Sequence, residues 1–560
     1  MRPFDANGVF GQQLEAGDAL RKAAVRGAGV TVFSQGMVFA LQMIATIVLA
    51  RILTPKDFGL VAMVTTFSLL LVGVGLNGFT EAIQQSEEMN HSLASNLFWI
   101  NLAVGLLFTL AFAASGSLLA RFFHDPLLVK IAIGISPTIF LTSISVEHLA
   151  LLKRAMAFSA VSANDIFARA FSAVLSISMA FMGYGYWALV GAALAQPLAA
   201  AVGAWILCRW VPSLPRKVPG TDSMVRFAVN IYGRYSFNYC ARNLDNILVG
   251  WRFGSDSLGF YKKAYDLFLL PAAQFSAPLT AVAVSALSRL QKDLVRYRRQ
   301  FLAALSVVAF LGMWLGADLT LIGKDIIRLV LGPEWAPAGV IFTFFGPGVG
   351  MMLLYAAHGW IHLSIGTPHR WFRWVIVEFT VTALLFFCGL PWGPVGVAAA
   401  WTVSFWILLL PAFWYAGEPI DLGVTSIITT VWKYVAASII ATVAGELIIR
   451  KAPFLATDNT AAAAASNIVA ISVMCTLLYL AAVVVFHGGL TPISRVISLG
   501  RDMLTRDNPA WTSGNDALTD GAAPHVRPDG EQSPFGIRAG TAPSPAGREV
   551  ESYKSVSTGL

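Results

Sequence analysis

Apolar stretches recur along most of the chain, and short polar or glycine-rich segments separate them. A helix needs about 20 consecutive apolar residues to cross the hydrocarbon core of a bilayer. Hydropathy averaged over windows of about 19 residues predicts roughly fourteen such helices. They lie at 29–50, 58–80, 96–119, 129–151, 166–183, 186–208, 228–250, 258–286, 301–322, 338–362, 372–390, 394–416, 427–449 and 464–486. We therefore expect an all-α, polytopic integral membrane protein.

Two short motifs recur about two hundred residues apart. The stretch ARILTPKDFGLVAMV begins at Ala50, and GWRFGSDSLGFYKKA begins at Gly250. In each, a helix-length segment ends near a basic residue, passes through a polar turn and restarts beside Gly59 or Gly259. Two glycine-rich hairpins, MGYGYWAL and GLPWGPVG, recur at a similar spacing. The repeats predict two pseudo-symmetric six-helix lobes, and the paired glycines would permit close approach of helices.

The predicted organisation has six parts. They are a cytoplasmic N-terminal segment, 1–28; an N-terminal six-helix lobe, 29–208; a linker, 209–227; a C-terminal six-helix lobe, 228–416; two additional transmembrane helices, 417–490; and a disordered cytoplasmic tail, 491–560. The tail is rich in Gly, Pro, Ser, Asp and Thr and poor in aliphatic residues, a composition typical of disorder.

Composition and charge agree with a membrane protein. Only 12% of the residues are charged, whereas a soluble domain carries roughly 25%. The net charge of +8 does not indicate nucleic-acid binding, because the basic residues sit between apolar spans and form no single patch. Lys and Arg are concentrated in alternate loops, with RLQKDLVRYRRQ (Arg289 to Gln300) as the strongest marker. This bias predicts that both termini are cytoplasmic.

The seventh predicted helix carries the most conspicuous polar residues. Arg234, Asn238, Arg242 and Asp245 follow steps of four, four and three, which places them on one helical face. Because charge in lipid is costly, this stripe must face protein or water. It is either an internal ion pair between Arg242 and Asp245 that joins helices, or the lining of a cationic cavity. The corresponding face of the first helix is uncharged, and its Gln42 is a further candidate for the cavity lining.

Other charged or titratable residues in the spans have weaker patterns. Asp165 and Arg169 lie four residues apart, as do Lys262 and Asp266, so local ion pairs are the simplest interpretation. His358 and His362 have a spacing that a metal site could use, but no third ligand lies nearby, so we expect no metal. Glu378 could couple protons together with these histidines. The candidates for coupling or gating are Asp165, Arg169, Asp266 and Glu378.

Motifs of common enzymes are missing from the sequence. There is no Walker motif, nucleophile elbow or HExxH pattern. No predicted loop between spans exceeds about 20 residues, which leaves no room for a catalytic domain. We therefore expect no ATP hydrolysis by this chain and no cofactor. A polysaccharide polymerase or ligase would need a large external loop with paired catalytic groups, which the sequence lacks.

Several motifs together resemble a known family. They are LARILTPKDFGLVAMV, GFTEAIQQ, GYGYWALV, NLDNILVGWRFGSDSLGFYKKAYDLFLLP and LGPEWAPAG, within residues 25–490. The sequence is similar to the polysaccharide transporter family of the multidrug/oligosaccharidyl-lipid/polysaccharide (MOP) flippase superfamily, of the colanic-acid and teichuronic-acid exporter type. The resemblance implies two six-helix lobes around a central cavity and alternating access.

The resemblance also implies a cargo and partners. The cargo would be an undecaprenyl-diphosphate-linked oligosaccharide repeat, moved across the bacterial inner membrane for exopolysaccharide or lipopolysaccharide synthesis. Membrane lipids, a polymerase and a co-polymerase would be its partners, and nucleic acid would not. Within the same superfamily, the alternative is a cation-coupled small-molecule exporter. That alternative predicts an acidic cation site, whereas the stripe of the seventh helix predicts a basic cavity.

Overall fold

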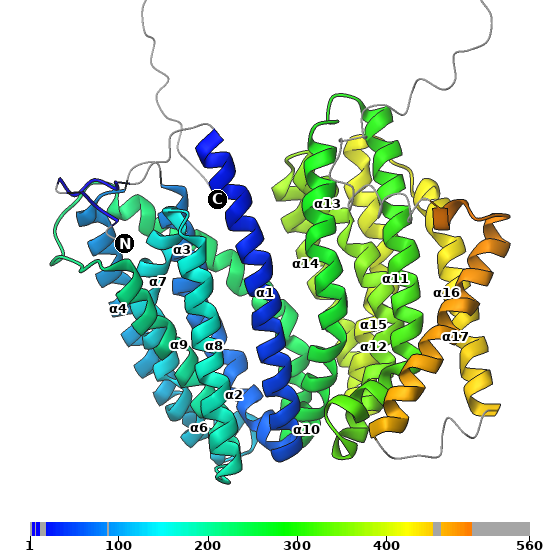
Figure 1. Cartoon of the computed structure of the whole chain (residues 1–560), viewed down its shortest axis with the longest axis horizontal. Helices are drawn as coiled ribbons and strands as arrows, with labels where there is room; N and C mark the ends of the chain where they lie inside the picture. Colours follow the sequence, from blue (N-terminus) through cyan, green and yellow to red (C-terminus); the bar gives the residue numbers. More distant parts are fainter. Residues whose placement is uncertain (1–2, 6, 12–17, 87–88, 452–460, 495–560) are drawn as a thin grey trace, which may run out of the picture. The chain divides into compact units, whose positions relative to one another are not determined.

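The computed structural model describes residues 3–5, 7–11, 18–86, 89–451 and 461–494. Within them the regular secondary structure is helical, apart from two isolated bridges near the N-terminus (Figure 1). The first half contains α1 (Asp18–Ile52), α2 (Pro55–Gly73), the π-helix η1 (Val74–Phe79), α3 (Thr80–Gln85), α4 (His91–Ala114), α5 (Gly116–Phe123), α6 (Leu127–Ile135), α7 (Pro137–Arg154), α8 (Phe158–Phe181) and α9 (Tyr186–Cys208). The all-α prediction is therefore confirmed.

The second half continues with longer helices. It contains α10 (Thr221–Ser288), α11 (Leu294–Val330), η2 (Pro333–Trp335), α12 (Ala336–Ala356), α13 (His358–Ser364), α14 (Pro368–Gly389), η3 (Leu390–Trp392), α15 (Gly393–Gly417), η4 (Glu418–Ile420), α16 (Val424–Lys451) and α17 (Ala461–His487). The tail predicted to be disordered lies outside the described residues beyond position 494.

Eleven described helical segments are long and apolar enough to cross a membrane. One of them, Pro368–Ile420, contains both α14 and α15, and α10 is not among the eleven. The chain is thus a multi-pass membrane protein, while the number fourteen remains a prediction.

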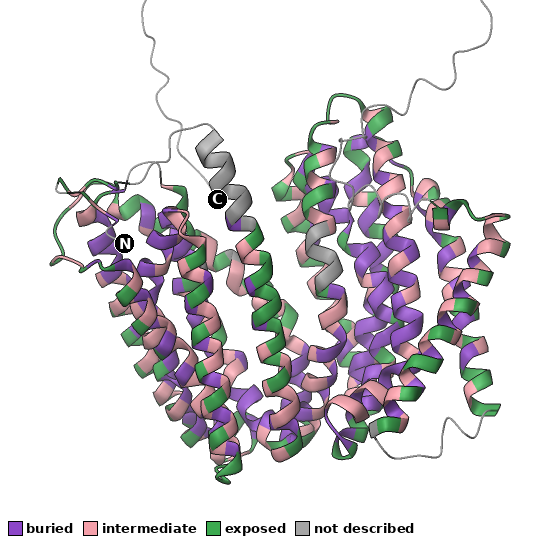
Figure 2. Cartoon of the chain, in the orientation of Figure 1, coloured by how far each residue is buried: buried purple, intermediate pink, exposed green. Residues whose placement is uncertain are grey.

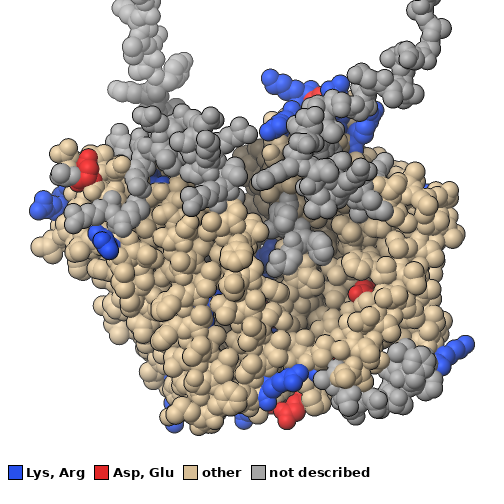
Figure 3. Space-filling view, viewed as in Figure 1, with Lys and Arg blue, Asp and Glu red and all other residues tan. Residues whose placement is uncertain are grey.

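Exposed residues occur along most of the described helices (Figure 2), and many of them are large and apolar. On α4, for example, Leu107 and Leu110 are 62% and 61% exposed. On the face shown in Figure 3, most visible Lys and Arg side chains lie toward two opposite edges, and the broad band between them shows few charged side chains. Because exposed leucines are stable in lipid and charged residues in its headgroup region, this distribution fits a bilayer-spanning protein.

The break in α10 explains how one long helical element turns back. Gly254 has φ 79° and ψ −175°, which only glycine adopts readily, so α10 consists of two helices. In the first half the equivalent position is Thr54, whose side chain accepts a hydrogen bond from the Asp57 N–H in a capping box. The polar turn expected at residues 255–257 is therefore displaced: the chain bends at Gly254, and helix resumes from Ser255.

The two repeated motifs pack against each other. A Cβ atom added to Gly59 would overlap the carbonyl of Ser255, and one added to Gly259 would overlap the carbonyl of Pro55. These helices therefore approach with backbone against backbone, which confirms the role expected for the two glycines.

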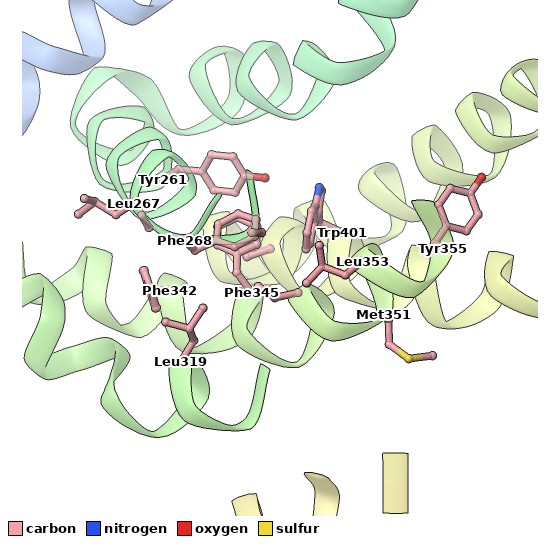
Figure 4. Close-up of a cluster of buried hydrophobic side chains, with 14 of the residues drawn as sticks. Tyr261, Leu267, Phe268, Leu319, Phe342, Phe345, Met351, Leu353, Tyr355 and Trp401 are labelled. Atoms are coloured by element: carbon pink, nitrogen blue, oxygen red, sulfur yellow. The ribbon is translucent and has the colours of Figure 1, made fainter. Parts of the chain in front are cut away.

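Aromatic packing makes the interior of the second half dense. Figure 4 shows the rings of Phe268 (α10), Phe345 (α12) and Trp401 (α15) gathered together. The Phe268 and Phe345 rings stack with centroids 4.5 Å apart, and the Trp401 ring lies 4.9 Å from Phe268. This cluster fixes α10 against α12 and α15 on one side of the cavity described next.

Candidate substrate cavity

A cavity of about 360 Å³ lies within the second half of the chain. Its walls come from α10, α12, α13, α14 and α15. They are largely aromatic, through Tyr265, Tyr355, Trp360, Trp371, Phe379, Phe386, Trp401 and Phe405. A mostly apolar wall with a few polar groups is the usual composition of a small-molecule site.

Three of the four residues in the predicted stripe line this cavity. They are Asn238, Arg242 and Asp245, all on α10. The side chain of Arg234, the fourth, lies outside the described part of the structure. Gln42 is exposed on α1 and does not line this cavity. The steps of four and three residues thus do place a polar stripe on one face of the helix.

Asp245 has a different partner from the one the sequence suggested. The Tyr261 hydroxyl donates to Asp245 Oδ2 at 2.9 Å, and the Asn246 N–H donates to Oδ1 at 2.8 Å. No ion pair joins Arg242 to Asp245 among the described residues. Of the two interpretations of the stripe, the internal ion pair is therefore not found in the described part of the structure. The cause is tertiary: Tyr261 lies sixteen residues further along, beyond the bend at Gly254, and packs back onto the carboxylate.

Glu378 enters the same cavity from α14. The Tyr355 hydroxyl donates to its Oε2 at 2.9 Å, and the Trp374 indole N–H donates to the Tyr355 oxygen at 2.7 Å. Arg242 and Glu378 line the same cavity. The described lining thus holds one guanidinium and two carboxylates, so the net basic lining expected from the stripe is not found in this cavity.

The remaining candidates lie elsewhere in local pairs. Arg169 Nε is 3.1 Å from Asp165 Oδ1, and Lys262 Nζ is 2.5 Å from Asp266 Oδ1. In each pair the two residues are four positions apart on one helix and partly exposed. Each pair therefore contributes little to the stability of the fold. The local interpretation of these spacings is confirmed, and none of the four residues lines the cavity.

Both histidines, His358 and His362, contact neighbouring groups of the protein. His358 Nδ1 lies 2.5 Å from the Tyr355 carbonyl, and His362 Nδ1 lies 3.2 Å from Thr367 Oγ1. Searching the described residues finds no group of three His, Cys, Asp or Glu side chains that could hold a metal ion.

Sequence reasoning missed the aromatic wall and the two tyrosines that orient the carboxylates. Tyr355 stands in an apolar segment typical of a core helix, and Tyr261 stands beside Lys262 and Lys263, where nothing in the sequence marks it as a partner of Asp245. Their contacts form only after α10, α12 and α14 pack together, so no local sequence pattern predicts these contacts.

Chemically, the cavity suits a ligand with both polar and apolar faces. The guanidinium of Arg242 offers a planar fork of donors to phosphate or carboxylate oxygens. Asp245 and Glu378 accept hydrogen bonds from hydroxyl or ammonium groups. Flat aromatic rings pack against apolar faces of a ligand.

A family model described as "Polysaccharide biosynthesis protein" matches residues 48–339, more than half of the chain. The chain belongs to this family. The resemblance expected from the sequence motifs is therefore confirmed.

Two curated relatives have names that describe their roles. The succinoglycan biosynthesis transport protein ExoT of Rhizobium meliloti (strain 1021) is 23% identical over 363 residues, which cover 64% of this chain and 73% of ExoT. The lipopolysaccharide biosynthesis protein WzxC of Escherichia coli (strain K12) is 22% identical over 324 residues, which cover 57% of this chain and 65% of WzxC. This family member is accordingly expected to be a transporter and not an enzyme.

A solved structure has the same fold. The lipid II flippase MurJ in its inward closed conformation superposes with a TM-score of 0.64 at 14% identity, covering 83% of this chain and 99% of MurJ. At this identity the likeness concerns the fold alone. It confirms the expected polytopic, flippase-like architecture.

Proposed function

We propose that this protein moves a lipid-linked oligosaccharide across the bacterial inner membrane by alternating access, for exopolysaccharide or lipopolysaccharide synthesis. The observation that carries the proposal is the match of residues 48–339 to the polysaccharide biosynthesis family. The names of ExoT and WzxC support the polysaccharide context, and the MurJ-like fold supports a flippase. The cargo would be an undecaprenyl-diphosphate-linked repeat unit.

Arg242 is our candidate for the group that binds the anionic part of the cargo. It is exposed to the cavity and makes no ion pair among the described residues. A guanidinium in a narrow, apolar-walled space is screened less than one in water, so it binds a diphosphate or acidic sugar more strongly. Asn238 would contact sugar hydroxyls. Arg234 and Gln42 are further candidates on the corresponding faces of the two halves.

Asp245 and Glu378 support a second role for the same cavity. Each carboxylate is held by a tyrosine hydroxyl, from Tyr261 and Tyr355 respectively, and both line the cavity that holds Arg242. Two fixed carboxylates could accept hydrogen bonds from hydroxyl groups of the cargo or bind a coupling cation. This pair is also the one observation that favours the alternative function, export of a small molecule coupled to a cation.

We further propose the arrangement in the membrane. Two six-helix lobes, 29–208 and 228–416, would rock against each other, with both termini in the cytoplasm. A polymerase and a co-polymerase would receive the exported unit, and no cofactor would be needed.

Substitution of Arg242 tests the flippase proposal. In cells that depend on this gene for polymer export, Arg242→Ala should leave the protein in the membrane and sharply reduce export. Losing one charge-assisted contact should cost roughly 1.5–3 kcal/mol of cargo binding. Arg242→Lys should restore export only in part, because an ammonium group cannot form the planar fork.

The matched control is Arg252→Ala. Arg252 is exposed on the same helical element and does not line the cavity, and its guanidinium lies 6.0 Å from the centre of the neighbouring Phe253 ring. Export should be normal in this control. Normal export in Arg242→Ala at normal abundance would show that the proposed anion site is wrong.

A further inference from the structure

Glu147 on α7 is the most unusual charged residue of the first half. Its side chain is 0% exposed, and neither carboxyl oxygen has a hydrogen-bond partner. Transferring an ionised carboxylate into such surroundings costs so much that the group normally takes up a proton or a cation instead. The burial of Glu147 therefore raises the question of what neutralises it.

The neighbouring elements supply no countercharge. The sequences of α4, η1 and α9 contain no Asp, Glu, Lys or Arg. On α3 the single carboxylate, Glu81, is exposed. Three further elements, α2, α6 and α8, also pack on α7. Their Lys56 and Lys130 are exposed, and Arg169 pairs with Asp165. An ion pair from these elements therefore does not balance Glu147.

The ionisable residues near Glu147 on α7 have other contacts. The His148 ring stacks on Trp205 with centroids 4.3 Å apart, and its Nε2 lies 3.1 Å from the Trp210 carbonyl oxygen. The Arg154 guanidinium donates to the Ile83 and Ser86 carbonyls at 2.8 and 2.6 Å. Neither carboxyl oxygen of Glu147 accepts a hydrogen bond from these side chains.

Asn101 on α4 also has a buried oxygen without a hydrogen-bond partner. Its Nδ2 donates to the Ser143 carbonyl at 3.1 Å, while its Oδ1 is buried without a donor. The Ser143 carbonyl that it binds lies four residues before Glu147, one turn away on the same face of α7. A protonated carboxyl group has one O–H to donate, and the Asn101 oxygen is an acceptor without a partner. One proton on Glu147 would thus neutralise the carboxylate and give the amide oxygen its missing hydrogen bond.

The π-helical turn η1 packs on Asn101 and on Val146, the residue before Glu147. A Cβ atom on Gly75 would lie 3.2 Å from Asn101 Oδ1 and 3.0 Å from Val146. On the same turn, a Cβ atom on Gly78 would lie 2.9 Å from the Ala228 carbonyl of α10. Single π-helical turns inside α-helices occur frequently at functional sites. Here the turn connects the Glu147–Asn101 pair to the helix that carries the cavity stripe.

We propose that Glu147 is a proton-binding site in the first half, with Asn101 Oδ1 as the acceptor of its O–H. When the O–H bond breaks, the proton passes to water and the electron pair stays on the carboxylate. That charge is stable only if water or a donor reaches it, so proton release requires η1 to move away from α7. Glu147 lies seven residues before the end of α7, or about 10 Å along the helix axis, which sets the length of the path to the predicted cytoplasmic surface.

Infrared spectroscopy of the purified full-length protein tests the proton directly. A protonated carboxyl group gives a carbonyl stretching band that is distinct from carboxylate bands and shifts in D2O. We expect Glu147→Gln to remove one such band at neutral pH. Glu81→Gln, which changes an exposed carboxylate on the adjacent α3, should leave the band intact. Identical spectra for Glu147→Gln and the wild type would overturn the proposal.

A sodium ion would be the competing occupant, and the same experiment distinguishes it. If the carboxyl band disappears when choline chloride is replaced by sodium chloride at constant pH, the site binds sodium and the proton assignment is wrong. If the band is insensitive to this exchange, the proton assignment stands.

Thermal unfolding provides a readout that does not depend on transport. Because glutamine mimics the protonated acid, Glu147→Gln should fold and be as abundant as the wild type. The midpoint of unfolding should fall as pH rises in the wild type, and this fall should be smaller in the variant. Loss of abundance in Glu147→Gln, together with an unchanged pH dependence, would contradict the proposal.

Discussion

Gly59 lies against the backbone carbonyl of Ser255, so closely that a methyl group at this position would overlap it. The contact is reciprocal, since Gly259 lies in the same way against the carbonyl of Pro55. Residues two hundred positions apart thus exchange roles, as in an isologous contact around a twofold axis. Nearby, the Trp335 indole N–H donates to the Ala50 carbonyl at 2.9 Å. Three of the motifs that carry the family resemblance therefore meet at one place.

A methyl group at Gly59 should destabilise this contact. Overpacking a tight site costs about 1–3 kcal/mol, so Gly59→Ala should lower the midpoint of thermal unfolding of the purified protein. The matched control is Gly36→Ala on α1, where nothing lies within 4 Å of an added Cβ. Equal stability of the two variants would show that the helices can separate at no cost.

The bend at Gly254 should depend on glycine. Its combination of φ 79° and ψ −175° lies in a region that other residues reach at a cost of about 1–3 kcal/mol. Gly254→Ala should therefore be less stable than the wild type, measured by thermal unfolding. Gly233→Ala changes another glycine of α10, whose Cβ would meet nothing within 4 Å, and should be neutral or slightly stabilising. If both substitutions act alike, the bend does not require glycine.

The Tyr261–Asp245 hydrogen bond should contribute to stability. Tyr261→Phe removes the donor from a carboxylate that is 1% exposed, and an unsatisfied buried acceptor costs about 1–3 kcal/mol or more. We expect lower stability in Tyr261→Phe, and a smaller further loss from it when Asp245→Asn is already present. Strictly additive effects in this double-mutant cycle would mean that the two groups do not interact.

The predicted orientation can be tested with single cysteines in a cysteine-free background. Lys56→Cys, in the exposed first turn of α2, should react with an impermeant thiol reagent added outside intact cells. Arg296→Cys, at the start of α11, should react only after the membrane is opened. The reverse pattern would place the termini outside. This orientation follows from the excess of Lys and Arg in alternate loops.

The helical fold could be predicted because it is decided locally. Each long apolar segment must satisfy its own backbone hydrogen bonds in lipid, and a helix does so within the segment. The stripe on α10 is equally local, because Asn238, Arg242 and Asp245 share one face through helical geometry alone. The number of spans is less certain from sequence, since α10 is the least apolar and is bent at Gly254.

The partners of the site residues could not be predicted in the same way. Glu378 shares a cavity with Arg242 because α14 packs beside α10, and Tyr261 reaches Asp245 because the chain bends between them. Glu147 stands in an apolar segment whose sequence does not distinguish it from residues near a span end. Only the packing of α4, α7 and η1 shows that its carboxyl group is enclosed.

The absence of side chains at Gly59 and Gly259 has a mechanical consequence. Interdigitated side chains hold two helices in one relative orientation, whereas a backbone-to-backbone contact allows the helices to rotate against each other. α1 has 35 residues, so it is about 52 Å long, and it ends immediately before this contact. If α1 tilted by roughly 10° about this contact, its far end would move by about 9 Å. A small rotation at the glycines would therefore produce a large displacement at the opposite end of α1.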